Sequence, residues 1–119
     1  MLVFLGGGVG SCLRFFISKT YNSYLEHFFL GTFLVNITGC LIMGFVLGLS
    51  FKSNYLTQNH TLLLSTGFCG GFTTFSAFAF EKHSLLKTGD LFNFSIYTLS
   101  SIVVGVIAIA LGLWLSKLL

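Results

Sequence analysis

Thr66-Gly-Phe-Cys-Gly-Gly-Phe-Thr-Thr-Phe-Ser-Ala-Phe-Ala-Phe80 is the stretch that decides the fold of this chain. Its two adjacent glycines and two threonines lie near the centre of a run, residues 53–80, that contains no Asp, Glu, Lys or Arg. Glycine and threonine form helices poorly, so we expect the helix to open at Gly70-Gly71. Carbonyls freed in this way could bind a cation if they are buried in protein. An unbroken helix with a glycine packing face is the alternative.

The composition around this stretch is that of a membrane protein. Of the 119 residues, 55% are hydrophobic and 8% are charged, and the mean hydropathy is +0.94. Residues 1–25, 28–51, 53–80 and 91–116 carry few or no charges, and each run is long enough for a bilayer-spanning helix of about 20 residues. The connectors are short, so neighbouring helices should run antiparallel. We therefore predict an all-α membrane protein with one four-helix transmembrane domain over residues 1–119.

Several functional classes are disfavoured. The net charge of +3 is scattered along the chain, so there is no basic face for a nucleic acid. The apolar runs are continuous rather than alternating, which favours helices over a membrane barrel. No catalytic triad or carboxylate pair is visible, so we do not expect an enzyme. Cys12, Cys40 and Cys69 share no metal-ligand spacing, and we interpret them as small buried residues.

Small and polar residues recur at helical spacing within the spans. Gly6 and Gly10 in the first span, and Gly44 and Gly48 in the second, are four residues apart. This spacing predicts close helix packing. Asn36 lies on the same stripe as the second pair. An amide inside a membrane is costly unless it is hydrogen-bonded or faces water, so Asn36 either joins helices or lines a pore.

Aromatic and hydroxyl residues mark the third and fourth spans. Phe75 and Phe78 are three residues apart and share a helix face with Glu81. Their default interpretation is core packing, although ring edges carry partial positive charge and can face an anion. Tyr97 and Ser101 are four residues apart in the fourth span. Their hydroxyls could donate to an anion, or they could form hydrogen bonds between helices.

Three motifs together resemble the Fluc family of small bacterial fluoride ion channels, and the match covers nearly the whole chain. The third motif is the longest and the most specific. The motifs are Gly7-Gly8-x-Gly10-x3-Arg14 in the first span, Gly31-Thr-x3-Asn36-x2-Gly39 in the second, and Gly67-Phe-Cys-Gly-Gly-Phe-Thr-Thr-Phe-Ser-x-Phe78 in the third.

The resemblance implies a concrete architecture and a set of site residues. Members of the family form antiparallel, dual-topology dimers whose two pores export fluoride passively and lower its cytoplasmic concentration, and a structural sodium ion lies at the dimer centre. The implied positions are, for the sodium ligands, the carbonyls of Gly70 and Thr73; for the pore, Asn36, Thr74, Phe75, Ser76, Phe78, Tyr97 and Ser101; and for the vestibule, Arg14 and Glu81. The implied location is a bacterial plasma membrane.

Two other functions are considered. A small proton-coupled multidrug transporter also has four helices, but it needs a membrane-embedded carboxylate, and we expect Glu81 at the edge of its span. A structural subunit of a larger complex would explain the glycines but not the residues from Gly70 to Phe78. The lysines are distributed almost evenly between the two sides. This weak bias suits a homodimer of dual topology, and it suits a heterodimer with a related chain equally well.

Overall fold

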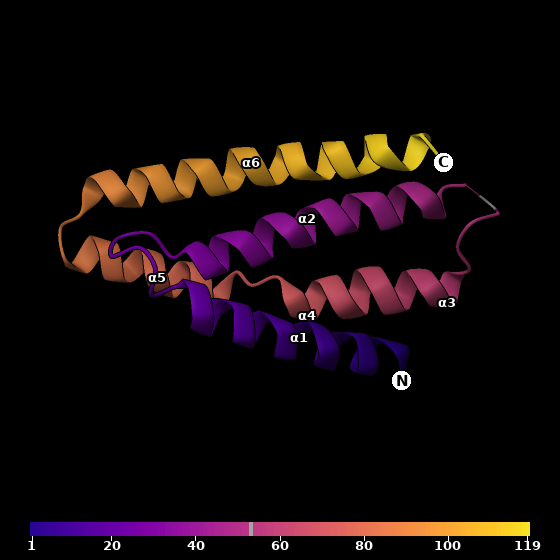
Figure 1. The fold of residues 1–119 in the computed structure, drawn as a ribbon, viewed down its shortest axis with the longest axis horizontal. Coiled ribbons are helices and arrows are strands. Elements are labelled where there is room, and N and C mark those ends of the chain that lie inside the picture. The colour runs from indigo at the N-terminus through magenta and orange to yellow at the C-terminus, as the bar shows by residue number, and fades with distance from the viewer. Residues whose placement is uncertain (53) are drawn as a thin grey trace.

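The computed structural model describes residues 1–52 and 54–119, and every regular element within them is a helix (Figure 1). The bundle is elongated, with principal extents of 51 × 28 × 19 Å. Helix α2 packs along α6, and α1 packs along η1 and α4. The elements are α1 (Leu2–Tyr21), α2 (Leu30–Ser50), α3 (Gln58–Thr61), the π-helix η1 (Leu62–Cys69), α4 (Gly70–Phe72), α5 (Ser76–Lys87) and α6 (Leu91–Lys117).

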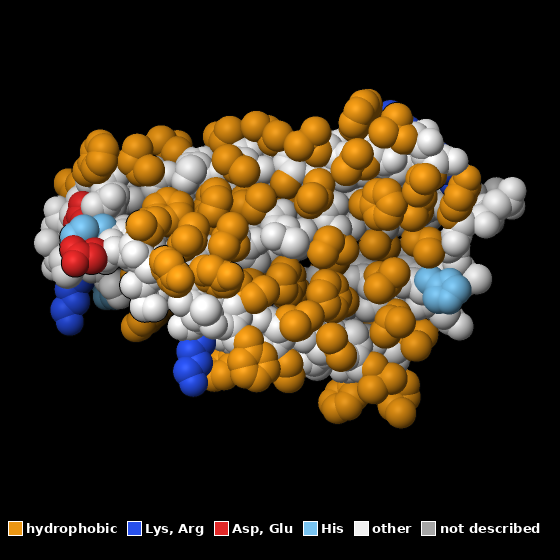
Figure 2. Space-filling model, in the orientation of Figure 1, with side chains coloured by type: hydrophobic (Ala, Val, Ile, Leu, Met, Phe, Trp, Pro, Cys, Tyr) orange, Lys and Arg blue, Asp and Glu red, His pale blue; other side chains and the backbone are white. Residues whose placement is uncertain are grey.

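The prediction of four membrane-spanning segments is confirmed. The segments Leu2–Tyr21, Leu30–Ser50, Gln58–Lys87 and Leu91–Lys117 are each long and apolar enough to cross a bilayer. The first residue of the predicted third span, Ser53, lies outside the described residues. On the face shown in Figure 2, hydrophobic side chains cover the length of the bundle and acidic side chains gather at one end. Such a surface is suited to lipid.

The third span is longer than the sequence predicts. The charge-free run ends at residue 80, but α5 continues to Lys87. Glu81 and Lys82, which the charge pattern assigns to a connector, are 6% and 7% exposed. The prediction is wrong because both side chains have polar partners on other helices, and these partners offset the cost of burying charge. Only the short segment from Thr88 to Asp90 joins α5 to α6.

The third span is broken, as predicted, but not at Gly70-Gly71. Both glycines lie in helix α4, and Thr73 takes an extended conformation with φ −80° and ψ 158°. A Cβ on Gly71 would collide with the backbone of Gly7. The glycine therefore serves the approach of α1, and the chain opens at the residues that follow.

Close glycine packing is confirmed on both sides of the bundle. Added Cβ atoms on Gly6 and Gly10 would collide with backbone atoms of the third span, and one on Gly44 would collide with the Ile109 carbonyl of α6. The partner of Gly6 lies in η1, a π-helix that the sequence pattern does not predict. These direct backbone contacts fix the position of α1 against the first half of the third span.

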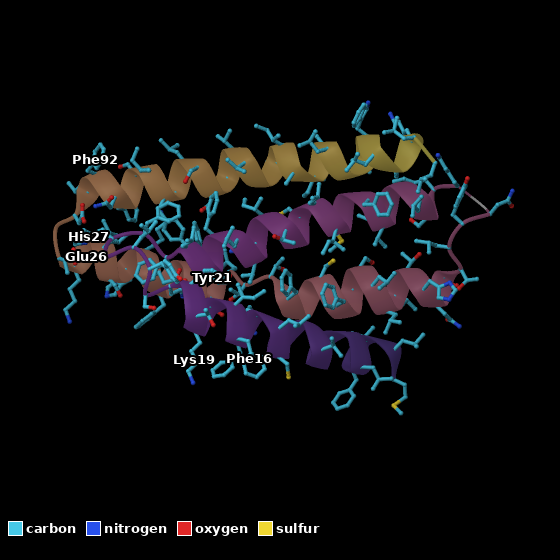
Figure 3. All side chains as sticks on the ribbon, viewed as in Figure 1. Phe16, Lys19, Tyr21, Glu26, His27 and Phe92 are labelled. Atoms are coloured by element: carbon cyan, nitrogen blue, oxygen red, sulfur yellow. The ribbon has the colours of Figure 1, made fainter. Side chains whose placement is uncertain are left out.

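The start of α6 is fixed at one end of the bundle. Asp90 accepts from the backbone N–H of Asn93 at 3.2 Å and from its side chain at 2.7 Å. These bonds, with a smaller contribution from His27, hold the pKa of the Asp90 carboxyl below its usual value. His27 Nδ1 lies 3.6 Å from Asp90 Oδ2. Figure 3 shows His27 and Glu26 together at this end, so the α1–α2 connection meets the start of α6 there.

The cysteines differ from one another. Cys69 is fully buried, as predicted. Cys12 is exposed, so the prediction that it is buried is wrong. It lies on α1 with Phe4, Val9 and Phe16 around a shallow apolar hollow. Cys40 is half-buried because it faces a cavity, which is described below.

The glycine packing predicts different effects for two neighbouring positions on α1. Gly10→Ala should lower the free energy of unfolding by about 1–3 kcal/mol, because its Cβ would overlap the Phe68 carbonyl. Gly8→Ala should instead raise it by about 0.5–1 kcal/mol, because alanine favours the helix more than glycine does and a Cβ at Gly8 meets nothing within 4 Å. Thermal unfolding of both variants in detergent measures the difference. Equal losses would show that α1 does not pack on the third span through Gly10.

Candidate functional site

A cavity of about 430 Å³ lies between α2, the break in the third span and α6. Its surface is mainly apolar, with a few polar groups at defined places. It brings together six of the predicted site residues. Its lining residues are Asn36, Gly39, Cys40, Met43, Thr73, Thr74, Phe75, Phe78, Ser101, Ile102 and Ile109. A cavity of this composition is a suitable place for a small ligand.

Asn36 holds the break in place. Its Nδ2 donates to the Thr74 carbonyl at 3.0 Å, and its Oδ1 accepts from the Thr74 N–H at 2.8 Å. The Thr74 hydroxyl in turn accepts from the Ala77 N–H at 3.2 Å and lies 3.3 Å from the Ser76 hydroxyl, at the first turn of α5. Asn36 therefore joins α2 to the break in the third span, and it borders the cavity. Its role in a pore stays a prediction.

Ser101 contributes a hydroxyl that lacks a hydrogen-bond partner among the described residues. Its Oγ is buried, and no described residue forms a hydrogen bond with it. Ser100, its neighbour, donates instead to the Tyr97 carbonyl at 3.3 Å. A buried hydroxyl without a partner costs free energy. Ser101 lines the cavity, while its Oγ lies buried beneath the cavity surface.

Phe75 and Phe78 lie between this cavity and a second one. Their ring centroids are 6.2 Å apart, and Phe75 is 79% exposed. The second cavity, of about 290 Å³, shares these two phenylalanines with the first and continues along α5 to Lys82. The two rings therefore border both spaces.

Tyr97 and Glu81 belong to a buried polar cluster next to the cavities. The Tyr97 hydroxyl donates to Glu81 Oε2 at 2.8 Å, and the Thr32 hydroxyl donates to Oε1 at 2.5 Å. Asn22 Nδ2 lies 3.5 Å from the same Oε1, and Asn22 Oδ1 accepts from the Thr32 N–H at 3.0 Å. Tyr97 is fully buried, and it borders neither cavity. Its ring centroid lies 5.2 Å from that of Phe78, so the cluster packs against one ring of the phenylalanine pair.

Arg14, the other predicted vestibule residue, is bound to the third span. Its Nε donates to the Gly71 carbonyl at 3.0 Å, and the Ser11 hydroxyl reaches the same oxygen at 3.4 Å. Its guanidinium therefore binds a backbone carbonyl next to the break.

The two predicted sodium ligands lie at the two ends of the short helix α4. Gly70 is exposed, and a Cβ there would meet nothing within 4 Å. The Thr73 hydroxyl donates to the Cys69 carbonyl at 2.8 Å. Because the Thr74 N–H donates to Asn36, it does not continue the helical ladder to the Gly70 carbonyl four residues earlier.

Three polar residues of this region, Asn22, Thr32 and Lys82, are not predicted by the sequence. Thr32 stands in the second motif without a role, and the charge pattern assigns Lys82 to a loop. One signal is present, because Lys82 follows Phe78 by four residues and therefore shares its helix face. Only the tertiary structure shows that the Phe94 carbonyl and the Thr98 hydroxyl of α6 accept hydrogen bonds from its ammonium group.

Comparison with known proteins gives a consistent result. The family model described as "CrcB-like protein, Camphor Resistance (CrcB)" matches residues 1–113. A protein of Chlorobium phaeobacteroides named fluoride-specific ion channel FluC is 42% identical over 118 residues, which is 99% of this chain and 92% of the relative. Proteins of the same name from Methylobacillus flagellatus and Gloeothece citriformis are 46% and 45% identical, over 99% and 98% of this chain and 94% and 95% of the relatives.

The different bonding of Asn36 and Ser101 predicts different effects on stability. Asn36→Ala should lower the free energy of unfolding by about 2–4 kcal/mol, because both polar groups of the Thr74 backbone lose their partner. Ser101→Ala should raise it by about 1 kcal/mol, since the variant removes a buried hydroxyl that has no partner among the described residues. Denaturant unfolding in detergent measures both. A stable Asn36→Ala variant would contradict its role in closing the break.

Proposed function

The chain belongs to the CrcB family, and from this membership we propose that it is a fluoride-selective channel through which fluoride leaves the cell passively. Relatives that match nearly the whole chain are named fluoride-specific ion channels. The multi-pass character of the protein follows from its four spans. Export across a bacterial plasma membrane, with a lower cytoplasmic fluoride concentration as its result, is part of the proposal.

The observation that carries the proposal is Ser101, which lines the larger cavity and whose buried hydroxyl forms no hydrogen bond with the described residues. Fluoride is a small anion that accepts hydrogen bonds, and a hydroxyl donor can replace part of its hydration shell. The edges of Phe75 and Phe78, which border the same cavity, add partial positive charge. None of these groups of the larger cavity is a full cation, so an anion is bound there weakly enough to leave again.

We further propose an antiparallel homodimer with two pores and a sodium ion at its centre, held by the carbonyls of Gly70 and Thr73. The open space at Gly70 supports this proposal, since no described part of the same chain covers it. The Thr74 N–H donates to Asn36 rather than to the Gly70 carbonyl, so at membrane depth this carbonyl needs another partner. This also supports the proposal. A cation shared by two inverted copies would provide that partner.

Glu81 bears on the alternative of a proton-coupled transporter. From the sequence we expect this carboxylate at the edge of its span, where it could not serve such a transporter. In the structure Glu81 is instead buried inside the segment Gln58–Lys87, where the hydroxyls of Thr32 and Tyr97 hold it. The position of Glu81 therefore no longer disfavours a transporter, and it is the family membership that favours the channel.

The direct test is fluoride efflux from liposomes that contain only the purified protein. We expect fluoride to leave rapidly and chloride to be retained. Ser101→Ala should slow fluoride efflux by up to about tenfold, because the anion loses one hydrogen bond. Cys12→Ala, at an exposed position on α1, should leave it unchanged. Absence of fluoride efflux, or fluoride accumulation driven by a pH gradient alone, would contradict the channel.

A second test addresses the dimer and its sodium ion. Gly70→Val should abolish the dimer in detergent and reduce fluoride efflux by at least about tenfold, because a β-branched side chain would occupy the space left for the partner. Thr73→Ser should behave like the wild type, since it keeps the backbone carbonyl and the hydroxyl that donates to Cys69. Light scattering after gel filtration measures the mass. A dimeric, active Gly70→Val protein would refute the central sodium site.

A further inference from the structure

Lys82 is a buried cation surrounded by aromatic rings. It is 7% exposed, and its Nζ lies 5.0 Å from the ring centroid of Phe78, 4.7 Å from that of Phe94 and 4.5 Å from that of Tyr97. The ammonium group donates to the Phe94 carbonyl at 2.7 Å and to the Thr98 hydroxyl. An ammonium group has three N–H donors, so one remains after these two bonds.

Among the described residues no carboxylate forms an ion pair with Lys82, although the charge of the adjacent Glu81 attracts it. The ion pairs found there join His27 to Glu26 and to Asp90. The neighbouring Glu81 uses its oxygens for the hydroxyls of Thr32 and Tyr97. Rings, a carbonyl and a hydroxyl offset only part of the cost of burying a charge. The Lys82 ammonium group therefore has no counter-ion in direct contact among the described residues.

Space for a counter-ion is present beside the ammonium group. Lys82 lines the cavity of about 290 Å³ that lies beyond the phenylalanine pair. This volume is several times that of one water molecule, about 30 Å³ in the liquid. The other lining residues are Phe75, Phe78, Ala79, His83, Leu86, Phe94 and Thr98. His83 is the other titratable group of this lining and is exposed.

We propose that Lys82 forms a second anion site in this cavity, in which its remaining N–H donates to fluoride. This inference rests on the proposed function, because it places the site in series with the larger cavity across Phe75 and Phe78. A fixed positive charge at one end of the pathway raises the local concentration of anions. Fluoride then reaches Ser101 and the ring edges from a cavity in which Lys82 has raised its local concentration.

The test removes the charge while it keeps the length of the side chain. Lys82→Met and Lys82→Gln are two neutral variants, and the glutamine retains N–H donors for the Phe94 carbonyl if the methionine protein does not fold. Lys87→Met is the matched control, since it removes the same charge from an exposed position of α5 outside both cavities. Fluoride efflux is measured over a range of internal fluoride concentrations. The half-saturating concentration should rise about tenfold in the neutral variants and stay within about twofold in the control.

A second readout does not depend on transport. Thermal unfolding in detergent is compared in sodium fluoride and in sodium gluconate of equal ionic strength. Fluoride should raise the Tm of the wild type and of Lys87→Met by at least about 3 °C, and the neutral Lys82 variants should lose most of this difference. A merely structural lysine would lower the Tm equally in both salts, and that result would overturn the anion site.

The two readouts separate this inference from the proposed function. If the wild type conducts fluoride and the neutral variants keep its half-saturating concentration, the channel stands and the Lys82 site is refuted. If the wild type does not conduct but fluoride stabilises it only when Lys82 is present, the anion site stands and the channel function is refuted.

Discussion

The structure depends on the pair of hydrogen bonds between Asn36 and the backbone of Thr74. A helix that opens inside a bilayer exposes polar backbone groups that lipid cannot satisfy. One amide side chain on α2 satisfies both groups of a single residue, so the chain can open without a strong penalty. The larger cavity lies against this bonded pair. The opened segment of the third span therefore leaves room for the cavity and also forms part of its lining.

On the other side of the phenylalanine pair, buried charged groups are likewise satisfied by partners on other helices. Glu81 is tied to Thr32 of α2 and to Tyr97 of α6, and Lys82 is tied to α6 through Thr98 and Phe94. Helix α5 thus carries two adjacent opposite charges with separate sets of partners. Each charge draws a neighbouring helix toward α5, and the Phe78 ring packs between Tyr97 of α6 and the Lys82 ammonium group.

The sequence predicts what depends on local pattern and misses what depends on distant partners. Charge-free runs are sufficient to find the four spans, and glycine spacing predicts the approach of α1. The opening is expected at Gly70-Gly71 rather than at Thr73, because glycine both weakens helices and permits close packing, and at Gly71 packing prevails. The burial of Glu81 is not predictable, since Thr32 lies 49 residues away in sequence.

The π-helix η1 has a consequence for how the chain length can change during evolution. Each residue of an α-helix turns the following chain by about 100°, so a deletion normally rotates every later side chain to another face. A π-helical segment holds a surplus residue in each wide turn. A one-residue deletion within Leu62–Cys69 can be absorbed by conversion to α-helix, and Gly71 still faces α1 afterwards. Related chains can therefore differ in length by one residue here while the break and both cavities keep their register.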